Sequence, residues 1–368
     1  MTLASEIDQR RREIRTDGYS MSIGEWVSLY EKDELDIHPE FQRFYRWSDT
    51  QKTNLIESIL LGIPLPPIFV NQRKDGVWDV VDGLQRLSTI FQLLGILKDE
   101  KNKLVNPLVL QSTKYLPSLL GMQWNDPKTP SNSLSNEMQL TIKRSKLAVS
   151  IILKESDVNA KYDLFQRLNT GGSELSPQEV RNCLLLMLNK KMYEWLKSLS
   201  QYSAFRNTIS LSDRTLEEAY DIELALRFII LFNIDENGLQ GLGDIGVFVT
   251  DRMTEMANNK RFPYKKVEET FKQTFDMLEQ MCGEDSFKRY NKTKKKHEGG
   301  FLLSQFEVVG MGLGHNIQNG TSIVKTSITK TIMSIWSDTR FTEWSRSGVN
   351  ASSRVRRLVP LGRTLFKK

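Results

Sequence analysis

The residues from Asp82 to Ser88 combine the side chains that a phosphate site needs. Arg86 is a planar donor that stays charged, and Gln85 and Ser88 are polar residues beside it. Gly83 permits a sharp backbone turn directly after Asp82. The chemistry that this pattern predicts is the binding of an anion such as phosphate.

A strand, a tight turn and a helix are expected to position these residues. Val77, Val80 and Val81 are β-branched and predict a buried strand. From Leu84 on, apolar residues recur at three- and four-residue spacing, which is typical of one helix face. A helix start has unpaired N–H groups and a positive dipole end, so it favours an anion. The alternative is an ordinary strand–turn–helix with Arg86 as a surface residue.

Size and composition predict a globular protein of about two domains. The chain has 368 residues, of which 39% are hydrophobic and 26% charged. Its net charge of +6 favours a polyanionic partner. No apolar run reaches the length of about 18 residues that suggests a membrane span, and no signal peptide is indicated. Two widely separated cysteines, Cys183 and Cys282, are typical of a reducing cytoplasm.

Two basic clusters in the C-terminal half are predicted to contact DNA. Lysine and arginine clusters neutralise backbone phosphates and release counterions. A solvated loop is the alternative for each cluster. The candidate DNA-binding residues are Lys288, Arg289, Lys292, Lys294, Lys295, Lys296, Arg354, Arg356 and Arg357.

Helix starts and strands alternate in the N-terminal part. Apolar runs at 68–70 and 147–153 predict strands, and residues 73–76 predict a hairpin turn. Three capping boxes predict helix starts, because a serine and the Glu or Gln three residues later satisfy backbone N–H groups reciprocally. These boxes are Ser22 with Glu25, Ser48 with Gln51, and Ser176 with Glu179.

The remaining segments set the domain organisation. Residues 3–16 predict a charged helix, and residues 37–47 predict an extended segment with a proline. Prolines across 99–137 predict a mobile insertion of short elements. We therefore expect an α+β domain over 1–200 and an all-α domain over 201–368. The helical patterns of the second domain lie at 213–233, 244–259, 263–283, 300–317 and 321–338.

Five spaced motifs occur in order at 37–43, 55–64, 67–70, 80–90 and 165–176. Together they resemble the DGQQR-motif domain at the front of GmrSD-type modification-dependent restriction enzymes and of the phosphorothioate-sensing SspE proteins. The first four also resemble the nucleotide-binding boxes of the ParB and sulfiredoxin superfamily. This resemblance implies a ParB/sulfiredoxin-like domain that binds and hydrolyses a nucleoside triphosphate in bacterial defence against foreign DNA.

The resemblance implies catalytic roles for Asp82, Gln85 and Arg86. Arg86 would neutralise phosphate, Gln85 would orient a water, and Asp82 would hold Mg²⁺ as the metal ligand. The alternatives are a plain helix cap for Asp82 and a bond back to the helix for Thr89. The further phosphate- or nucleotide-binding candidates are Gln42, Arg43, Arg46, Gly83, Ser88, Asn169, Thr170 and Gly171. Arg43 and Arg46 have cation–π packing on neighbouring aromatic rings as their alternative.

Two departures from the family pattern affect these roles. Leu84 stands where the family has its second signature glutamine. The C-terminal HNH nuclease domain of many relatives needs paired histidines, and the three present, His38, His297 and His315, do not form that pattern. The C-terminal helices are therefore interpreted as a binding or assembly module, with a partner nuclease subunit and a homo-oligomer both left open.

Two functions of different classes remain in competition. The first is a Mg²⁺-dependent nucleoside-triphosphate hydrolase, or nucleotide-gated switch, that acts on DNA in restriction-type defence. The second is a ParB-like DNA-binding or nicking protein without nucleotide turnover, because such a pocket suits a backbone phosphate equally well. A third interpretation, a degenerate scaffold for another subunit, is disfavoured by the intact Asp82, Gln85 and Arg86. The GxGxxG string at 241–246 follows no predicted strand, which argues against a dinucleotide site.

Overall fold

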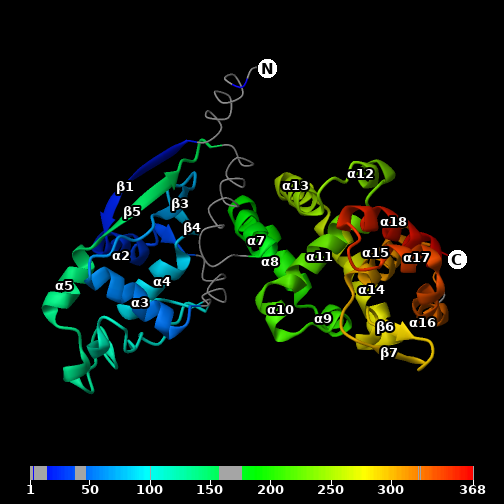
Figure 1. Ribbon diagram of the computed structural model, residues 1–368. Coiled ribbons are helices and arrows are strands. Elements are labelled where there is room, and N and C mark those ends of the chain that lie inside the picture. Colours follow the sequence, from blue (N-terminus) through cyan, green and yellow to red (C-terminus); the bar gives the residue numbers. More distant parts are fainter. Residues whose placement is uncertain are drawn as a thin grey trace. The chain divides into compact units, whose positions relative to one another are not determined.

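The computed structural model describes residues 3, 15–37, 47–99, 101–156, 176–321, 323 and 325–367. It divides into two compact units, unit 1 (Met1–Glu174) and unit 2 (Leu175–Lys368) (Figure 1). This division comes earlier than residue 200, because α7 (Pro177–Leu188) and α8 (Lys190–Ser200) pack on helices of unit 2. An α+β unit followed by a helical unit is the class that the sequence predicts.

A five-stranded mixed sheet forms the centre of unit 1, with the strand order β1-β5-β3-β4-β2. The predicted hairpin turn at 73–76 joins β3 and β4, which pair antiparallel. Buried and exposed residues alternate along β5, so one face of the sheet points into the core. The strands are β1 (Thr16–Ser22), β2 (Leu35–Asp36), β3 (Ile68–Gln72), β4 (Trp78–Asp82) and β5 (Lys146–Ile152).

Helices of unit 1 cover this buried face (Figure 1). The capping boxes predicted for α2 and α3 are both present, and so is the one that starts α7 in unit 2. The helices are α2 (Ile23–Glu31), α3 (Asp49–Leu60), α4 (Leu84–Leu93) and α5 (Asn136–Arg144). The expected helix over 3–16 lies almost wholly outside the described residues, although β1 already begins at Thr16.

The segment 99–137 is part of the unit 1 core, so its prediction as a mobile insertion is wrong. Its short elements are the predicted kind, with 3₁₀ turns at η2 (Pro117–Leu119) and η3 (Pro130–Asn132). Glu57 of α3 holds it in place by accepting hydrogen bonds from the backbone of Tyr115 at 3.2 Å and of Leu116 at 3.1 Å. The side chains that it buries are Leu108, Leu110, Leu119, Trp124 and Leu134.

Unit 2 is mostly helical, but it also contains a short antiparallel hairpin. This hairpin, β6 (Arg289–Asn291) and β7 (Lys296–Glu298), lies within the basic run where no strand was expected. Charged residues have low strand propensity, so the sequence pattern did not predict these two strands. The helices after α8 are α9 (Ser203–Ile209), α10 (Asp213–Glu217), α11 (Tyr220–Leu231), α12 (Glu236–Gln240), α13 (Ile245–Asn258), α14 (Tyr264–Cys282), α15 (Leu303–Gln318), α16 (Lys325–Ser334), α17 (Thr339–Trp344) and α18 (Ala351–Leu365), with 3₁₀ turns η5 (Gly283–Asp285) and η6 (Ile335–Ser337).

Two glycines set the distance between α15 and α18. A Cβ atom at Gly312 would meet the backbone of Gly362, and one at Gly362 would meet the carbonyl of Val308. These helices therefore approach backbone to backbone, which only glycine permits. None of the helices in the described part of the chain is both long and apolar enough to cross a membrane.

Candidate functional site: the start of helix α4

Helix α4 begins at a left-handed glycine that offers no capping side chain. Gly83 has φ 99° and ψ 9°, and no side-chain hydrogen bond caps this helix. By contrast, Ser22, Ser48 and Ser135 cap α2, α3 and α5 with their hydroxyls. A Cβ atom at position 83 would collide with the side chain of Ile68. The first N–H groups of α4 therefore have no side-chain acceptor of the kind that the serine hydroxyls supply to α2, α3 and α5.

Arg86 is buried beside this helix start and connects three segments. Its side chain is 11% exposed, and its Nη2 donates to Oδ2 of Asp82 at 2.9 Å. Its Nη1 donates to the carbonyl of Pro66, in the loop before β3. Burial lowers the pKa of Arg86, and the adjacent Asp82 acts in the opposite direction. A guanidinium has five N–H groups, so these two bonds position Arg86 without using all its donors.

Asp82 is the exposed member of this pair. It is the last residue of β4, and its side chain is 35% exposed. The N-cap of α4 is Gly83, so the interpretation of Asp82 as a plain helix cap is wrong. Among the described residues, no three His, Cys, Asp or Glu side chains group as a metal cluster. A Mg²⁺ ion fits here only as a one-carboxylate site completed by water and phosphate oxygens.

The other polar residues of the first turns have different surroundings. Gln85 Oε1 accepts from the backbone of Trp47 at 3.4 Å. Thr89 Oγ1 donates to the Gln85 carbonyl at 2.7 Å, which confirms the predicted bond back to the helix. Ser88 is fully buried, and its hydroxyl has no hydrogen-bond partner within the described part of the chain. Leu84 packs against the unit 1 core, so this departure from the family falls at a packing position.

Six predicted phosphate-binding residues lie outside the described residues. These are Gln42, Arg43, Arg46, Asn169, Thr170 and Gly171. Pro66 is a member of the site that the sequence did not indicate. The proline-rich run at 64–67 was the available signal, because a rigid loop beside a strand offers a fixed carbonyl.

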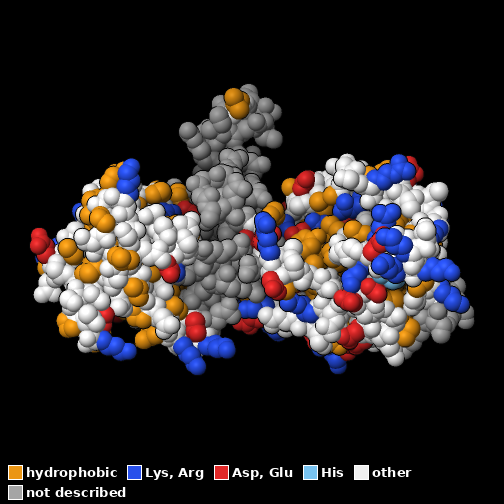
Figure 2. All heavy atoms as spheres, turned by 60° about the horizontal axis from the view of Figure 1, so that its bottom comes forward, with side chains coloured by type: hydrophobic (Ala, Val, Ile, Leu, Met, Phe, Trp, Pro, Cys, Tyr) orange, Lys and Arg blue, Asp and Glu red, His pale blue; other side chains and the backbone are white. Residues whose placement is uncertain are grey.

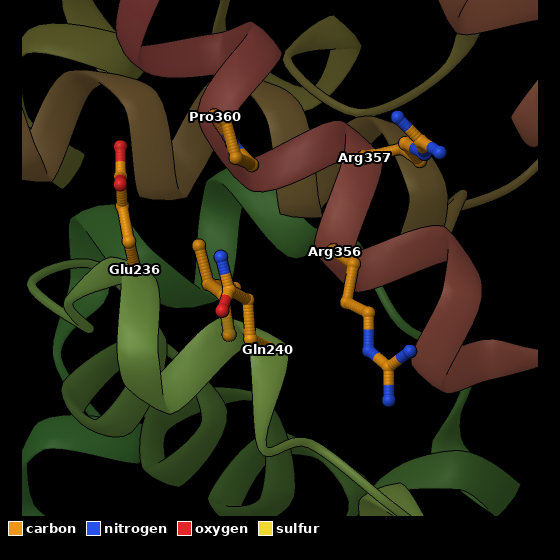
Figure 3. Close-up of a pocket in the computed structure, with 6 residues that line it drawn as sticks. Glu236, Gln240, Arg356, Arg357 and Pro360 are labelled. Atoms are coloured by element: carbon orange, nitrogen blue, oxygen red, sulfur yellow. The ribbon is translucent and has the colours of Figure 1, made fainter.

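The C-terminal arginines do not form one DNA-binding cluster. Arg354 Nε donates to Oε2 of the buried Glu307 at 2.7 Å, so this predicted DNA-binding arginine is already paired within unit 2. Arg356 donates to the carbonyl of Leu242, and Arg357 lies 5.5 Å from the ring centroid of Trp344. Arg356 and Arg357 lie on α18 (Figure 3). They line a hollow of about 490 Å³ together with Glu236, Leu239, Gln240 and Pro360.

Within the run 288–296 the lysines also differ. Lys288 pairs with Glu284 at 3.0 Å, and Lys294 pairs with Glu298 at 3.4 Å. Figure 2 likewise shows acidic side chains among the basic ones over unit 2. Arg289 packs over Trp336, 5.7 Å from its ring centroid. The exposed lysines at and beside the β6–β7 turn, which carry no ion pair in the described contacts, are Lys292, Lys295 and Lys296.

A comparison with protein families bears on this geometry. The model of the GmrSD restriction endonuclease, N-terminal domain, matches residues 23–186. Residues 23–186 are a GmrSD-type N-terminal domain. This domain includes the α4 start with Asp82 and Arg86 and extends into α7, and it associates the chain with restriction-type defence and with DNA. No curated protein and no solved structure matches the chain.

Proposed function

We propose that the GmrSD-type domain binds a nucleoside triphosphate at the start of α4 and hydrolyses it, gated by or acting on DNA in restriction-type defence. The observation that carries this proposal is the uncapped α4 start beside the partly exposed Asp82. Uncapped N–H groups at a helix start bind phosphate oxygens well. An exposed carboxylate at the same point suits Mg²⁺, which prefers to share its coordination with phosphate and water.

Each side chain has a defined part in this proposal. Mg²⁺ bound at Asp82 would neutralise phosphate charge. Arg86 orients Asp82 through its 2.9 Å bond and retains N–H groups for a phosphate oxygen. Gln85 lies on the first turn and would orient the attacking water. Gly83 supplies the left-handed backbone from which α4 starts and leaves room for the side chain of Ile68.

A second candidate function is ParB-like binding of a DNA phosphate without nucleotide turnover. One observation favours it: Arg86 already donates to Asp82 and to the Pro66 carbonyl. The positive charge that remains suits the single negative charge of a backbone phosphate better than the several charges of a triphosphate. In both proposals the lysines at and beside the β6–β7 turn, Lys292, Lys295 and Lys296, supply the DNA contact of unit 2.

The deciding experiment is phosphate release by the full-length protein with ATP, GTP, CTP or UTP and Mg²⁺, with and without duplex DNA. We expect turnover with at least one nucleotide, and its loss in Asp82→Asn. Asp36→Asn is the matched control, because Asp36 pairs with Arg73 at 2.5 Å on the same sheet, away from the α4 start. If no triphosphate binds or is hydrolysed while DNA binds, the second candidate function replaces the first.

A further inference from the structure

A cluster of aromatic rings and lysines on unit 2 contains none of the residues of the α4 start or of the β6–β7 turn. Trp195 of α8 meets Phe262 and Tyr264 at the start of α14, with ring centroids 5.7 and 5.1 Å away. Phe262 and Tyr264 are themselves 5.0 Å apart. All three side chains are only partly buried. The three rings are therefore accessible in part to a ligand.

The surface beside these rings is hollowed and basic. A depression of about 600 Å³ is lined by Phe262, Pro263, Tyr264, Lys265, Lys266 and Glu269. Residues 258–267 contain four cations and no acid. Those cations, Lys260, Arg261, Lys265 and Lys266, are exposed and have no ion pair among the described contacts. The positive charge here is therefore available to a ligand.

Neighbouring contacts hold the rings in place. Trp195 Nε1 donates to Glu268 at 3.0 Å, and Lys272 pairs with the same carboxylate at 2.6 Å. The bond from Lys272, together with that from Trp195, lowers the pKa of Glu268, so this acid stays ionised and paired. Lys191 lies 5.4 Å from the ring centroid of Tyr264. Glu269 also lines the depression and has no ion pair among the described contacts. Its single negative charge is outnumbered by the four cations of residues 258–267.

We propose that this surface, formed by Trp195, Phe262, Tyr264, Lys265 and Lys266, binds an unpaired base of a single DNA strand. Aromatic rings stack on any base, and adjacent lysines bind the flanking phosphates. The interplanar angles of 71°, 88° and 78° exclude a continuous flat platform. The rings form a corner, which fits one splayed base and not a run of stacked bases. A duplex keeps its bases inside, so only its phosphates can interact here.

The inference rests on the proposed action on DNA but is independent of nucleotide hydrolysis. The experiment measures binding of a labelled oligothymidylate and of a duplex with the same number of phosphates, by fluorescence anisotropy over a range of salt. The ring variants are Phe262→Leu and Tyr264→Leu, which keep apolar bulk and remove the stacking face. We expect each to weaken single-strand binding by about 5- to 150-fold and to leave duplex binding unchanged.

Charge variants test the lysines separately. Lys265→Gln with Lys266→Gln should reduce the slope of log affinity against log salt by about 1.4 for the single strand. Lys32→Gln with Lys74→Gln is the matched control, because it removes equal charge from exposed positions of unit 1 that have no part in any proposed DNA contact, and it should leave the slope unchanged. Equal single-strand affinity of folded ring variants and wild type would overturn the proposal.

A second readout serves if a ring variant fails to fold. Oligothymidylate should quench the fluorescence of the wild-type protein, and the quench should shrink in Trp195→Phe. Absence of any quench overturns the proposal without a folded ring variant. Phosphate release that persists without single-strand binding removes only this inference, whereas single-strand binding without phosphate release removes only the hydrolase proposal.

Discussion

Arg86 in unit 1 and Arg354 in unit 2 each bind a carboxylate, yet only one of them marks a candidate ligand site. Arg86 pairs with Asp82, whose side chain is 35% exposed. Arg354 pairs with Glu307, whose side chain is 1% exposed. An exposed carboxylate can still bind an ion or water, whereas a fully buried one depends on the partners packed around it. The exposure of the carboxylate, and not the presence of the arginine, distinguishes a candidate ligand site from an ion pair that only stabilises packing.

The largest expected effect comes from breaking the buried pair. Arg354→Met should cost about 3–5 kcal/mol of unfolding free energy at pH 7, because it leaves the Glu307 charge buried without its arginine. Urea unfolding followed by circular dichroism measures this. The double variant Glu307→Gln with Arg354→Met should recover much of the loss. A loss below about 1 kcal/mol in Arg354→Met would show that the pair does not hold α15 to α18.

The same pair predicts a pH dependence. Burial raises the pKa of Glu307, although Arg354 and Arg227 act in the opposite direction. The folded state thus keeps this proton to a higher pH than the unfolded chain does. Glu307 then favours folding most at low pH, and this contribution disappears as pH rises through the folded-state pKa. The cost of Arg354→Met should therefore be smaller at pH 5 than at pH 7 in the same urea titration.

The next effect tests how closely the α4 start is packed. Gly83→Ala adds left-handed strain of about 1–2 kcal/mol and a collision with Ile68 worth about 1–3 kcal/mol. Gly76→Ala is the matched control in the same sheet, since Gly76 has φ 92° and open space around its Cβ position. In thermal unfolding, Gly83→Ala should have a lower midpoint temperature than Gly76→Ala. Equal costs would mean that the α4 start relaxes around a side chain.

At Arg86 we expect a smaller stability cost than at Arg354. Arg86→Ala should lose about 1–3 kcal/mol, because Asp82 can rehydrate and only the Pro66 carbonyl is left without its donor. Gln85→Ala should change stability by less than about 0.5 kcal/mol. Both should remove phosphate release, measured with the best nucleotide at saturating concentration. Unchanged turnover in both folded variants would contradict a hydrolytic site at the α4 start.

The smallest effect on stability is expected at the hairpin turn. Lys292→Gln with Lys295→Gln should leave unfolding unchanged and reduce the salt slope of duplex binding by about 1.8. Arg356→Gln with Arg357→Gln serves as a comparison on α18, where each arginine already has a contact within unit 2. If the salt slope of duplex binding is unchanged in the lysine variant, the hairpin lysines do not contact DNA.

Local features of this chain could be predicted because a few neighbouring residues decide them. The serine capping boxes, the 73–76 turn, the sharp turn at Gly83 and the Thr89 back-bond all act within about four residues. Helix patterns after residue 200 were also readable from apolar spacing, as in α13 and α14. The GmrSD-type domain was identifiable from its motifs, and the family match over 23–186 confirms it.

Tertiary structure alone decided which of the chemically similar residues are available to a ligand. β1 pairs with β5, with Thr16 opposite Ile152. The local sequence of a strand does not predict which distant strand it will pair with. Arg354 pairs with Glu307 on another helix, and Arg86 donates to the Pro66 carbonyl. Trp195 of α8 contacts Phe262 in the segment just before α14. Sequence specifies residue type and local conformation, whereas exposure and pairing depend on contacts between segments far apart in the chain. The amino-acid sequence therefore determined where the residues of the proposed phosphate site lie, and only the fold decided which of their charged groups are exposed.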